Sequence, residues 1–143
     1  MFKCPNCGTI YYPKPAPAVA GIIIKSGKLL LVKRNIEPGK GKWALPSGFI
    51  NYGEEPLKAL KREMKEELGI DIQEAALFTA KIGKAHKDKL VLGLFYLVNS
   101  HRGRIRLSGE NSDANWFTLS SLTKIAFRDN LQAIREYIKQ SKE

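Results

Sequence analysis

The sequence predicts a single domain of the α/β or α+β class, in which strands and helices pack as layers. Its 143 residues match the usual length of one domain, and a hydrophobic content of 43% is enough for a core. Short apolar runs rich in β-branched residues or leucine predict strands, and two segments with apolar residues at helical spacing predict helices.

The first apolar runs predict a β-hairpin. Residues 18–24 and 28–32 are rich in β-branched residues and leucine, and Lys25-Ser26-Gly27 between them is typical of a turn. Residues 35–42 form a loop rich in glycine and lysine, and residues 43–45 predict a short strand.

The segment 56–68 predicts a helix. Pro56 suits the first turn, where no N–H is required, and Gly69 is a natural C-cap because glycine readily adopts a left-handed conformation. Apolar residues at three- and four-residue spacing form one stripe for packing, made of Leu57, Leu60, Met64 and Leu68.

The remainder of the chain predicts further short strands, one turn of helix and a C-terminal helix. Strands are expected over residues 76–82, 90–98, 105–107 and 115–118, and a helical turn is expected to start at Ser120-Ser121-Leu122. An amphipathic helix near the C-terminus is marked by Phe127, Leu131, Ile134 and Ile138.

Residues 1–17 predict an irregular knuckle or arm ahead of a main domain over residues 18–143. Pro13, Pro15 and Pro17 exclude a helix from this arm. The arm lacks the apolar core of a secretory signal, and the apolar runs near the N-terminus fall far short of the roughly 20 residues of a membrane helix. We therefore expect a cytoplasmic protein with no membrane partner.

The chain is strongly basic. It has 24 lysine and arginine residues against 14 aspartate and glutamate residues, a formal net charge of +10. This excess either favours an anionic partner, such as a nucleotide phosphate or a nucleic acid, or only keeps the protein in solution. Within residues 48–70 the acids outnumber the bases, which suits an acidic metal pocket in a basic surround.

Carboxylates gather on the predicted helix at 56–68. Glu63, Glu66 and Glu67 project on one side, where like charges repel unless a cation lies between them. The preceding loop, residues 48–54, holds two glycines and leads into the helix N-terminus, where free N–H groups favour phosphate. Together these features predict Mg²⁺ or Mn²⁺ bound near a phosphoanhydride that water attacks. Taken alone, the glutamates are more typical of a solvated helix face with Glu–Lys pairs, and it is the preceding loop that favours the metal site.

The segment 48–70, GFINYGEEPLKALKREMKEELGI, resembles the signature of the Nudix hydrolases, G-x₅-E-x₇-R-E-U-x-E-E-x-G-U, where U is a bulky apolar residue. This resemblance implies a mixed β-sheet sandwiched between α-helices, and cleavage of a nucleoside diphosphate linked to a moiety X. All the constrained positions match, namely Gly48, Glu54, Arg62, Glu63, Met64, Glu66, Glu67, Gly69 and Ile70.

The resemblance also implies roles within this segment. Glu63, Glu66 and Glu67 are expected to coordinate the divalent metal, and Gly48 to approach the metal or phosphate with its backbone. Arg62 is expected to orient a helix carboxylate through a bidentate pair. Glu54 is expected to brace the loop or assist the metal site.

The general base varies within the family, and three glutamates are candidates for it. Glu66 and Glu67 lie in the signature itself. Glu110 lies six residues before Trp116, in a stretch that resembles the position of a late acidic residue in pyrophosphatase-type members. A solvated loop charge is an equally good interpretation of Glu110.

Four residues are candidates for substrate binding. Arg34 ends the second strand of the predicted hairpin, close to where the site should lie, and could clamp a phosphate. Trp43, Phe49 and Tyr52 could stack on a base, although Trp43 is equally suited to the core.

Cys4 and Cys7, in Cys4-Pro-Asn-Cys7-Gly8, resemble half of the zinc ribbon that precedes the catalytic domain in the NADH pyrophosphatases and some related enzymes. A structural zinc site takes four ligands, and the chain offers only these cysteines and two histidines, His86 and His101. The pair is therefore a metal-free relic, a Zn²⁺ site shared with a second subunit of a homodimer, or a site that recruits a distant histidine.

These observations favour a Mg²⁺-dependent hydrolase of a dinucleotide or nucleotide sugar that is ADP-ribose-, NADH- or FAD-like. Residues 79–89 lack the glutamine, proline and aromatic residues of the NADH pyrophosphatases, so the identity of X stays open. One alternative is a pyrophosphohydrolase of noncanonical nucleoside triphosphates. The other is a non-catalytic Nudix-fold regulator that binds nucleotide or RNA, although such a binder has no need of clustered carboxylates.

Overall fold

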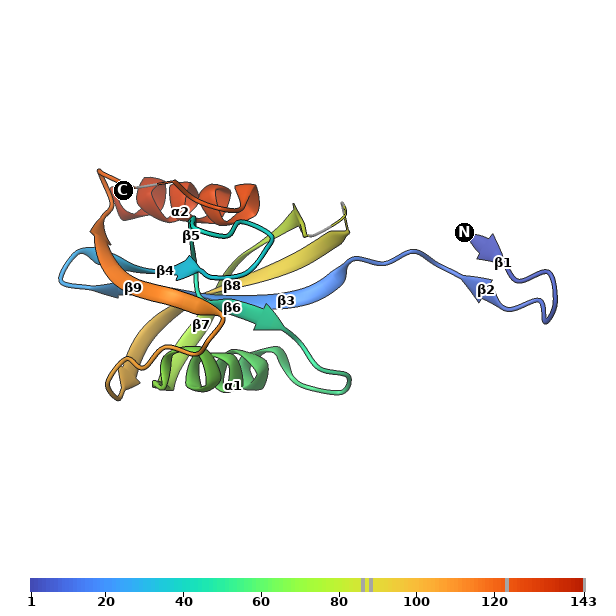
Figure 1. Cartoon of the computed structure of the whole chain (residues 1–143), viewed down its shortest axis with the longest axis horizontal. Helices are drawn as coiled ribbons and strands as arrows, with labels where there is room; N and C mark the ends of the chain where they lie inside the picture. Colours follow the sequence, from blue (N-terminus) through green and yellow to red (C-terminus); the bar gives the residue numbers. More distant parts are fainter. Residues whose placement is uncertain (86, 88, 123, 143) are drawn as a thin grey trace.

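A mixed β-sheet lies between two helices in the computed structural model, which describes residues 1–85, 87, 89–122 and 124–142 (Figure 1). Helix α1, Pro56–Leu68, covers one face, and helix α2, Arg128–Ser141, covers the other. The predicted fold class is confirmed. The strands are β1 Phe2–Lys3, β2 Ile10–Tyr11, β3 Ala16–Lys25, β4 Lys28–Arg34, β5 Trp43–Ala44, β6 Ser47–Phe49, β7 Asp71–Lys84, β8 Leu90–Arg102 and β9 Asn111–Thr118.

Strand β3 lies at the centre of the sheet. It runs parallel to β8 and antiparallel to β4 and β6, and β9 pairs with β4. The predicted hairpin forms, with Ser26 and Gly27 at positive φ in its turn, but β3 and β4 pair only over the two residue pairs next to that turn. They separate beyond it because β3 pairs with β8 and β6 while β4 pairs with β9.

The central strands β3 and β4 bury both of their faces. Along β4, Leu30 and Val32 join the core under α1, whereas Leu29 and Leu31 join the core under α2. Alternate side chains of a strand point to opposite faces, so a strand between two helical layers is apolar at every position. This explains the continuous apolar run in the sequence.

Helix α1 has the bounds that its sequence predicts. Gly69 ends it with φ 70°, and the Gly69 N–H donates to the Lys65 carbonyl at 3.0 Å. Leu60, Met64 and Leu68 are fully buried against the sheet. Because this stripe faces the core, it fixes which side of the helix presents the glutamates.

Two predicted elements are wrong. Residues 105–107 form no strand, because the Arg106 N–H donates to the Leu68 carbonyl at 2.7 Å and the Ser108 N–H to the Glu67 carbonyl at 3.2 Å. This segment therefore satisfies the end of α1 instead of pairing in the sheet. Residues 120–122 do not start a helix, because residues 118–121 form a turn in which the Ser121 N–H donates to the Thr118 carbonyl at 3.2 Å.

Other predicted elements are present with different bounds. The strands predicted over 76–82, 90–98 and 115–118 extend to the longer β7, β8 and β9. Phe127, expected on the apolar stripe of the last helix, is the N-cap residue of α2.

The N-terminal arm holds a small antiparallel hairpin, β1–β2, which lies well apart from the sheet (Figure 1). Strand β3 begins at Ala16, two residues before the expected start of the main domain. Among the described residues, neither helix has both the length and the apolar character needed to cross a membrane.

Candidate active site

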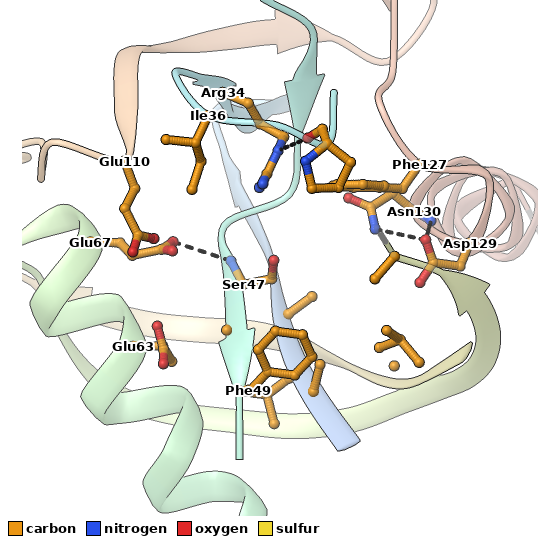
Figure 2. A pocket seen from close by; sticks show the side chains of 18 of the residues that line it. Arg34, Ile36, Ser47, Phe49, Glu63, Glu67, Glu110, Phe127, Asp129 and Asn130 are labelled. Carbon is orange, nitrogen blue, oxygen red and sulfur yellow. Dashed lines mark hydrogen bonds between the residues drawn. The ribbon is translucent and has the colours of Figure 1, made fainter. Parts of the chain in front are cut away.

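A cavity of about 660 Å³ opens between α1, β6, the β7–β8 hairpin and the start of α2 (Figure 2). We call one end of it the acidic end, defined by Glu63, Glu66, Glu67 and Glu110. The other is the α2 end, defined by Phe127, Asp129 and Asn130. The cavity brings together most of the site residues that the sequence predicts, namely Arg34, Gly48, Phe49, Glu63, Glu66, Glu67 and Glu110.

Gly48 makes room for a carboxylate. It lies on β6, paired with Val19 of β3, and a Cβ built on it would fall 1.9 Å from the Glu63 carboxyl carbon. Only glycine therefore allows the Glu63 side chain to lie directly against the strand.

Arg62 connects the loop to the helix carboxylates. Its Nη1 donates to Glu63 at 2.7 Å and to Glu66 at 3.2 Å. The expected bidentate pair is made to Glu54 instead of to a helix carboxylate, through Nε at 2.8 Å and Nη2 at 3.0 Å. Nη2 also donates to the Phe49 carbonyl at 2.9 Å, so one guanidinium ties residues 49–54 to α1.

Glu54 owes an unusual acidity to this pairing. Hydrogen bonds from Arg62, and a further one from the Asn51 N–H at 3.0 Å, lower the pKa of Glu54 to about 2. A carboxylate whose pKa falls on folding stabilises the folded state above its unfolded pKa of about 4.3, and loses that contribution as the pH falls towards 2.

Glu54→Gln should therefore make the stability of the folded protein depend less strongly on pH in the acid range. Melting curves at several pH values should show a wild-type melting temperature that falls steeply on acidification below about pH 4, and a weaker fall in the variant. At neutral pH the variant should be less stable, because Arg62 loses its charged partner. Glu55→Gln is the matched control, since exposed Glu55 makes no side-chain capping bond, and an equal effect in it would contradict this account.

Glu67 is the most buried carboxylate of the acidic end. It is 8% exposed, and its Oε2 accepts the Ser47 N–H at 3.3 Å (Figure 2). Burial, together with the charges of Glu63 and Glu110, raises the pKa of Glu67 to about 8. Burial also raises the pKa of Glu63, although its hydrogen bond from Arg62 opposes this. A cation would relieve the repulsion among these carboxylates.

The donor set at the acidic end fits a hard divalent cation. Carboxylate oxygens are the ligands that Mg²⁺ and Mn²⁺ prefer. Ser108 lines the same cavity, and its buried Oγ has no hydrogen-bond partner among the described residues. Across those residues no three His, Cys, Asp or Glu side chains already form a metal cage. Arg62 takes one oxygen of Glu63 and one of Glu66, so their second oxygens would be the ones to meet a metal.

Arg34 and Glu110 approach the cavity from the β4 and β9 side. The Arg34 Nε donates to the Pro38 carbonyl at 2.6 Å, and its guanidinium carbon lies 5.0 Å from the Phe127 ring centroid. Burial lowers the pKa of Arg34. Glu110 reaches towards Glu67 from the turn before β9 (Figure 2).

Two predicted binding residues lie elsewhere. Trp43 packs edge-on against Phe117, with centroids 4.8 Å apart, and belongs to the core under α2. Tyr52 is fully exposed on the loop before α1. Neither lines the cavity, so the structure gives neither of them a place at a bound base.

The cysteines also lie outside this cavity. Cys4 is partly buried and Cys7 is exposed, both on the knuckle between β1 and β2. Hydrogen bonding to Thr9 lowers the pKa of the Cys7 thiol. His101 lies on β8, at the end of that strand away from its pairing with the start of β3. His86 lies outside the described residues.

Sequence reasoning missed the α2 end. The Asn130 Oδ1 accepts the Leu45 N–H at 2.9 Å, and its Nδ2 donates to the Asp129 Oδ1 at 3.2 Å. The Asp129 carboxylate lies over glycines of β7 and β8, since a Cβ on Gly83 would fall 2.6 Å from its Oδ2 and one on Gly93 3.3 Å. Two adjacent polar residues at the start of an apolar-striped helix are the signal that could have indicated this site.

Comparison with known proteins agrees with this geometry. A profile of the NUDIX domain matches residues 14–139. The chain is 35% identical over 130 residues to the ADP-ribose pyrophosphatase of Methanocaldococcus jannaschii, covering 90% of this chain and 76% of that protein. It is 31% identical to the NAD-capped RNA hydrolase NudC of Chromobacterium violaceum, over 83% of this chain but only 44% of that protein.

Solved structures agree as well. The MutT NUDIX hydrolase of Burkholderia pseudomallei superposes with a TM-score of 0.80 at 26% identity, over 85% of this chain and 97% of that one. The domain match covers most of the sequence, including the whole of the 48–70 segment. The chain belongs to the Nudix hydrolase family.

Proposed function

We propose that this chain is a Mg²⁺-dependent pyrophosphohydrolase of substrates in which adenosine diphosphate is linked to a second group, with ADP-ribose, NADH and FAD as the candidates. One observation carries the proposal: a single cavity joins the carboxylates of α1 to an aromatic and polar end formed by α2. Its volume of about 660 Å³ is ample for a nucleotide derivative. The similarity to an ADP-ribose pyrophosphatase supports the same substrate class.

Glu63, Glu66 and Glu67 are the residues that would hold the metal. When bound, Mg²⁺ would lower the pKa of a water molecule and neutralise charge that develops on the phosphates. Gly48 allows Glu63 to reach its position, and Arg62 keeps Glu63 and Glu66 oriented. Such supporting contacts commonly matter 10–100-fold in metal affinity.

The reaction consumes one water molecule. The water oxygen bonds to one phosphorus atom, the bridging P–O bond breaks, and the departing phosphate oxygen leaves with the electron pair. Glu110 would accept the proton of the attacking water, because it points towards Glu67 in the cavity and comes from outside α1. Arg34 can hold the negative charge of a phosphate from its position on the cavity wall.

The α2 end suits a purine base. Phe127 offers an aromatic ring at this end, and Phe49 of β6 lines the same cavity. The Asp129 Oδ1 accepts both hydrogen bonds from Asn130, and no described residue donates to Oδ2. The exocyclic amino group of adenine is a donor that this free oxygen can accept.

A substrate panel in H₂¹⁸O tests the proposed function. ADP-ribose, NADH, FAD and several nucleoside triphosphates are incubated with Mg²⁺ or Mn²⁺, and products are identified by mass. We expect AMP and the phosphate of X, with ¹⁸O in one product marking the attacked phosphorus. Turnover of triphosphates alone would favour the noncanonical-nucleotide enzyme. Salt-sensitive RNA binding without any turnover would favour the regulator.

Asp129→Asn tests the base-binding end in the same panel. An amide donor in place of Oδ2 would face the donor of adenine, so we expect KM for the adenine substrate to rise about 5- to 150-fold, the range for an unpaired buried polar group. The matched control is Asp113→Asn, an exposed aspartate of β9 that does not line the cavity. Equal KM values in both variants would exclude Asp129 from base recognition.

A further inference from the structure

The N-terminal arm carries a second cluster of chemically reactive side chains, which the proposed hydrolysis does not use. Cys4 and Cys7 lie on the knuckle between β1 and β2. The Gly8 N–H donates to the Cys4 carbonyl at 2.9 Å, and the Cys4 N–H to the Thr9 carbonyl at 2.8 Å. Gly8 has φ 74°, the left-handed conformation that closes this turn. The backbone of the knuckle is thus fixed by its own hydrogen bonds.

The arm holds the knuckle away from the rest of the chain. The segment that joins it to β3 contains Pro13 and Pro15, which favour an extended and semi-rigid spacer (Figure 1). Two aromatic side chains of the hairpin are exposed, Phe2 to 65% and Tyr11 to 61%, and their rings stack with centroids 6.3 Å apart. Free thiols and exposed aromatic rings on one projecting hairpin form a surface that another protein chain can cover.

The pair of thiols is an incomplete metal site. Two cysteines three positions apart are the usual half of a tetrahedral zinc site, which takes four ligands. Among the described residues, no third His, Cys, Asp or Glu completes a site with them. His101 lies on β8 beyond its pairing with Ile23, whereas the arm joins the sheet where Ala16 pairs with Val91.

We propose that the knuckles of two copies of this chain share one Zn²⁺, each copy supplying the thiolates of Cys4 and Cys7. A second copy is the simplest source of two more thiolates with the same geometry. The same contact would cover Phe2 and Tyr11 on both hairpins. Each thiol loses its proton on binding, so metal uptake releases protons and weakens at low pH.

Metal content and mass in solution test this proposal. The full chain, purified without chelator under reducing conditions, is analysed for zinc by mass spectrometry and for size by light scattering. We expect about one zinc per two chains and a dimer that becomes monomeric when a chelator removes the zinc. Co²⁺ in place of zinc should show the charge-transfer bands of four thiolates per metal ion.

Variants of the arm show whether the two thiols themselves hold the zinc and the dimer. Cys4→Ser and Cys7→Ser should each lose zinc and dimerise poorly, whereas Lys14→Ser, an exposed change on the same arm, should keep both properties. Hydrolysis should continue in all three variants, because the arm lies outside the cavity.

Four results would overturn the shared site. They are one zinc per monomer, loss of zinc in His86→Gln, a dimer that reductant and not chelator dissociates, and a monomer with no zinc and free thiols. None of these results bears on the proposed hydrolysis, which the substrate panel tests separately.

Discussion

Replacing Glu67 with glutamine should abolish hydrolysis and leave the fold intact. The Glu67 side chain is buried at the acidic end, where it accepts a hydrogen bond from the Ser47 N–H. The negative charges of Glu63 and Glu110 repel its own charge. An amide of the same shape removes the negative charge that would hold the metal. We expect kcat/KM to fall by at least about 10³-fold, equivalent to roughly 4 kcal/mol of transition-state stabilisation. Steady-state kinetics with saturating Mg²⁺ provide the measurement.

The same variant should be more stable than the wild type without metal. The pKa of Glu67 is about 8 in the folded protein, above its unfolded value of about 4.3. A carboxyl group whose pKa rises on folding favours the folded state while it is protonated, and that advantage is lost as the pH rises through the folded pKa. The difference in melting temperature between Glu67→Gln and the wild type should therefore grow between about pH 4 and pH 8.

Added metal should make the wild type more stable than the Glu67→Gln variant. Mg²⁺ or Mn²⁺ binds only the folded wild type and raises its melting temperature, and the glutamine variant should respond little. Glu74→Gln, an exposed glutamate of β7, is the matched control and should behave as the wild type in both assays. Unchanged turnover in Glu67→Gln would remove Glu67 from the catalytic site.

Local chemistry explains which elements were predictable. Pro56 and Gly69 set the ends of α1, and its apolar stripe sets the buried face, so every determinant of that helix lies within its own sequence. Residues 105–107 have the composition of a strand, but the N–H groups of Arg106 and Ser108 satisfy carbonyls at the end of α1. That choice depends on a helix far back in the chain, which no local pattern records.

The two ends of the candidate site differ in the same way: one follows largely from local sequence and the other depends on a distant contact. Three of the four carboxylates of the acidic end come from one continuous segment, and their spacing alone placed Glu63, Glu66 and Glu67 together. The α2 end depends on a contact between Leu45 and Asn130, 85 positions apart. Trp43 could equally belong to a binding surface or to a core, and packing against Phe117 decides for the core. Composition cannot decide such a case, because an aromatic ring suits both environments.

Replacing Gly48 with alanine should weaken metal binding by about 10- to 100-fold, the usual effect of disturbing a residue that positions a ligand. The new Cβ would fall within 1.9 Å of the Glu63 carboxyl carbon, a distance that no real contact allows. The strand cannot retreat without breaking the pairing of Gly48 with Val19. Glu63 must therefore move, and it leaves both the metal position and its 2.7 Å hydrogen bond with Arg62.

Metal titration distinguishes this displacement from a loss of fold. Glu63 is the end of a flexible side chain, so the fold should survive, and circular dichroism with a melting curve should confirm it. Activity should then need more Mg²⁺ for half-saturation and recover in part at high concentration, because the ligand is displaced and not deleted. Gly109→Ala is the matched control, since a Cβ there meets nothing within 4 Å. A Gly48→Ala protein that binds Mn²⁺ with wild-type affinity would show that the close approach of β6 to Glu63 has no part in holding the metal.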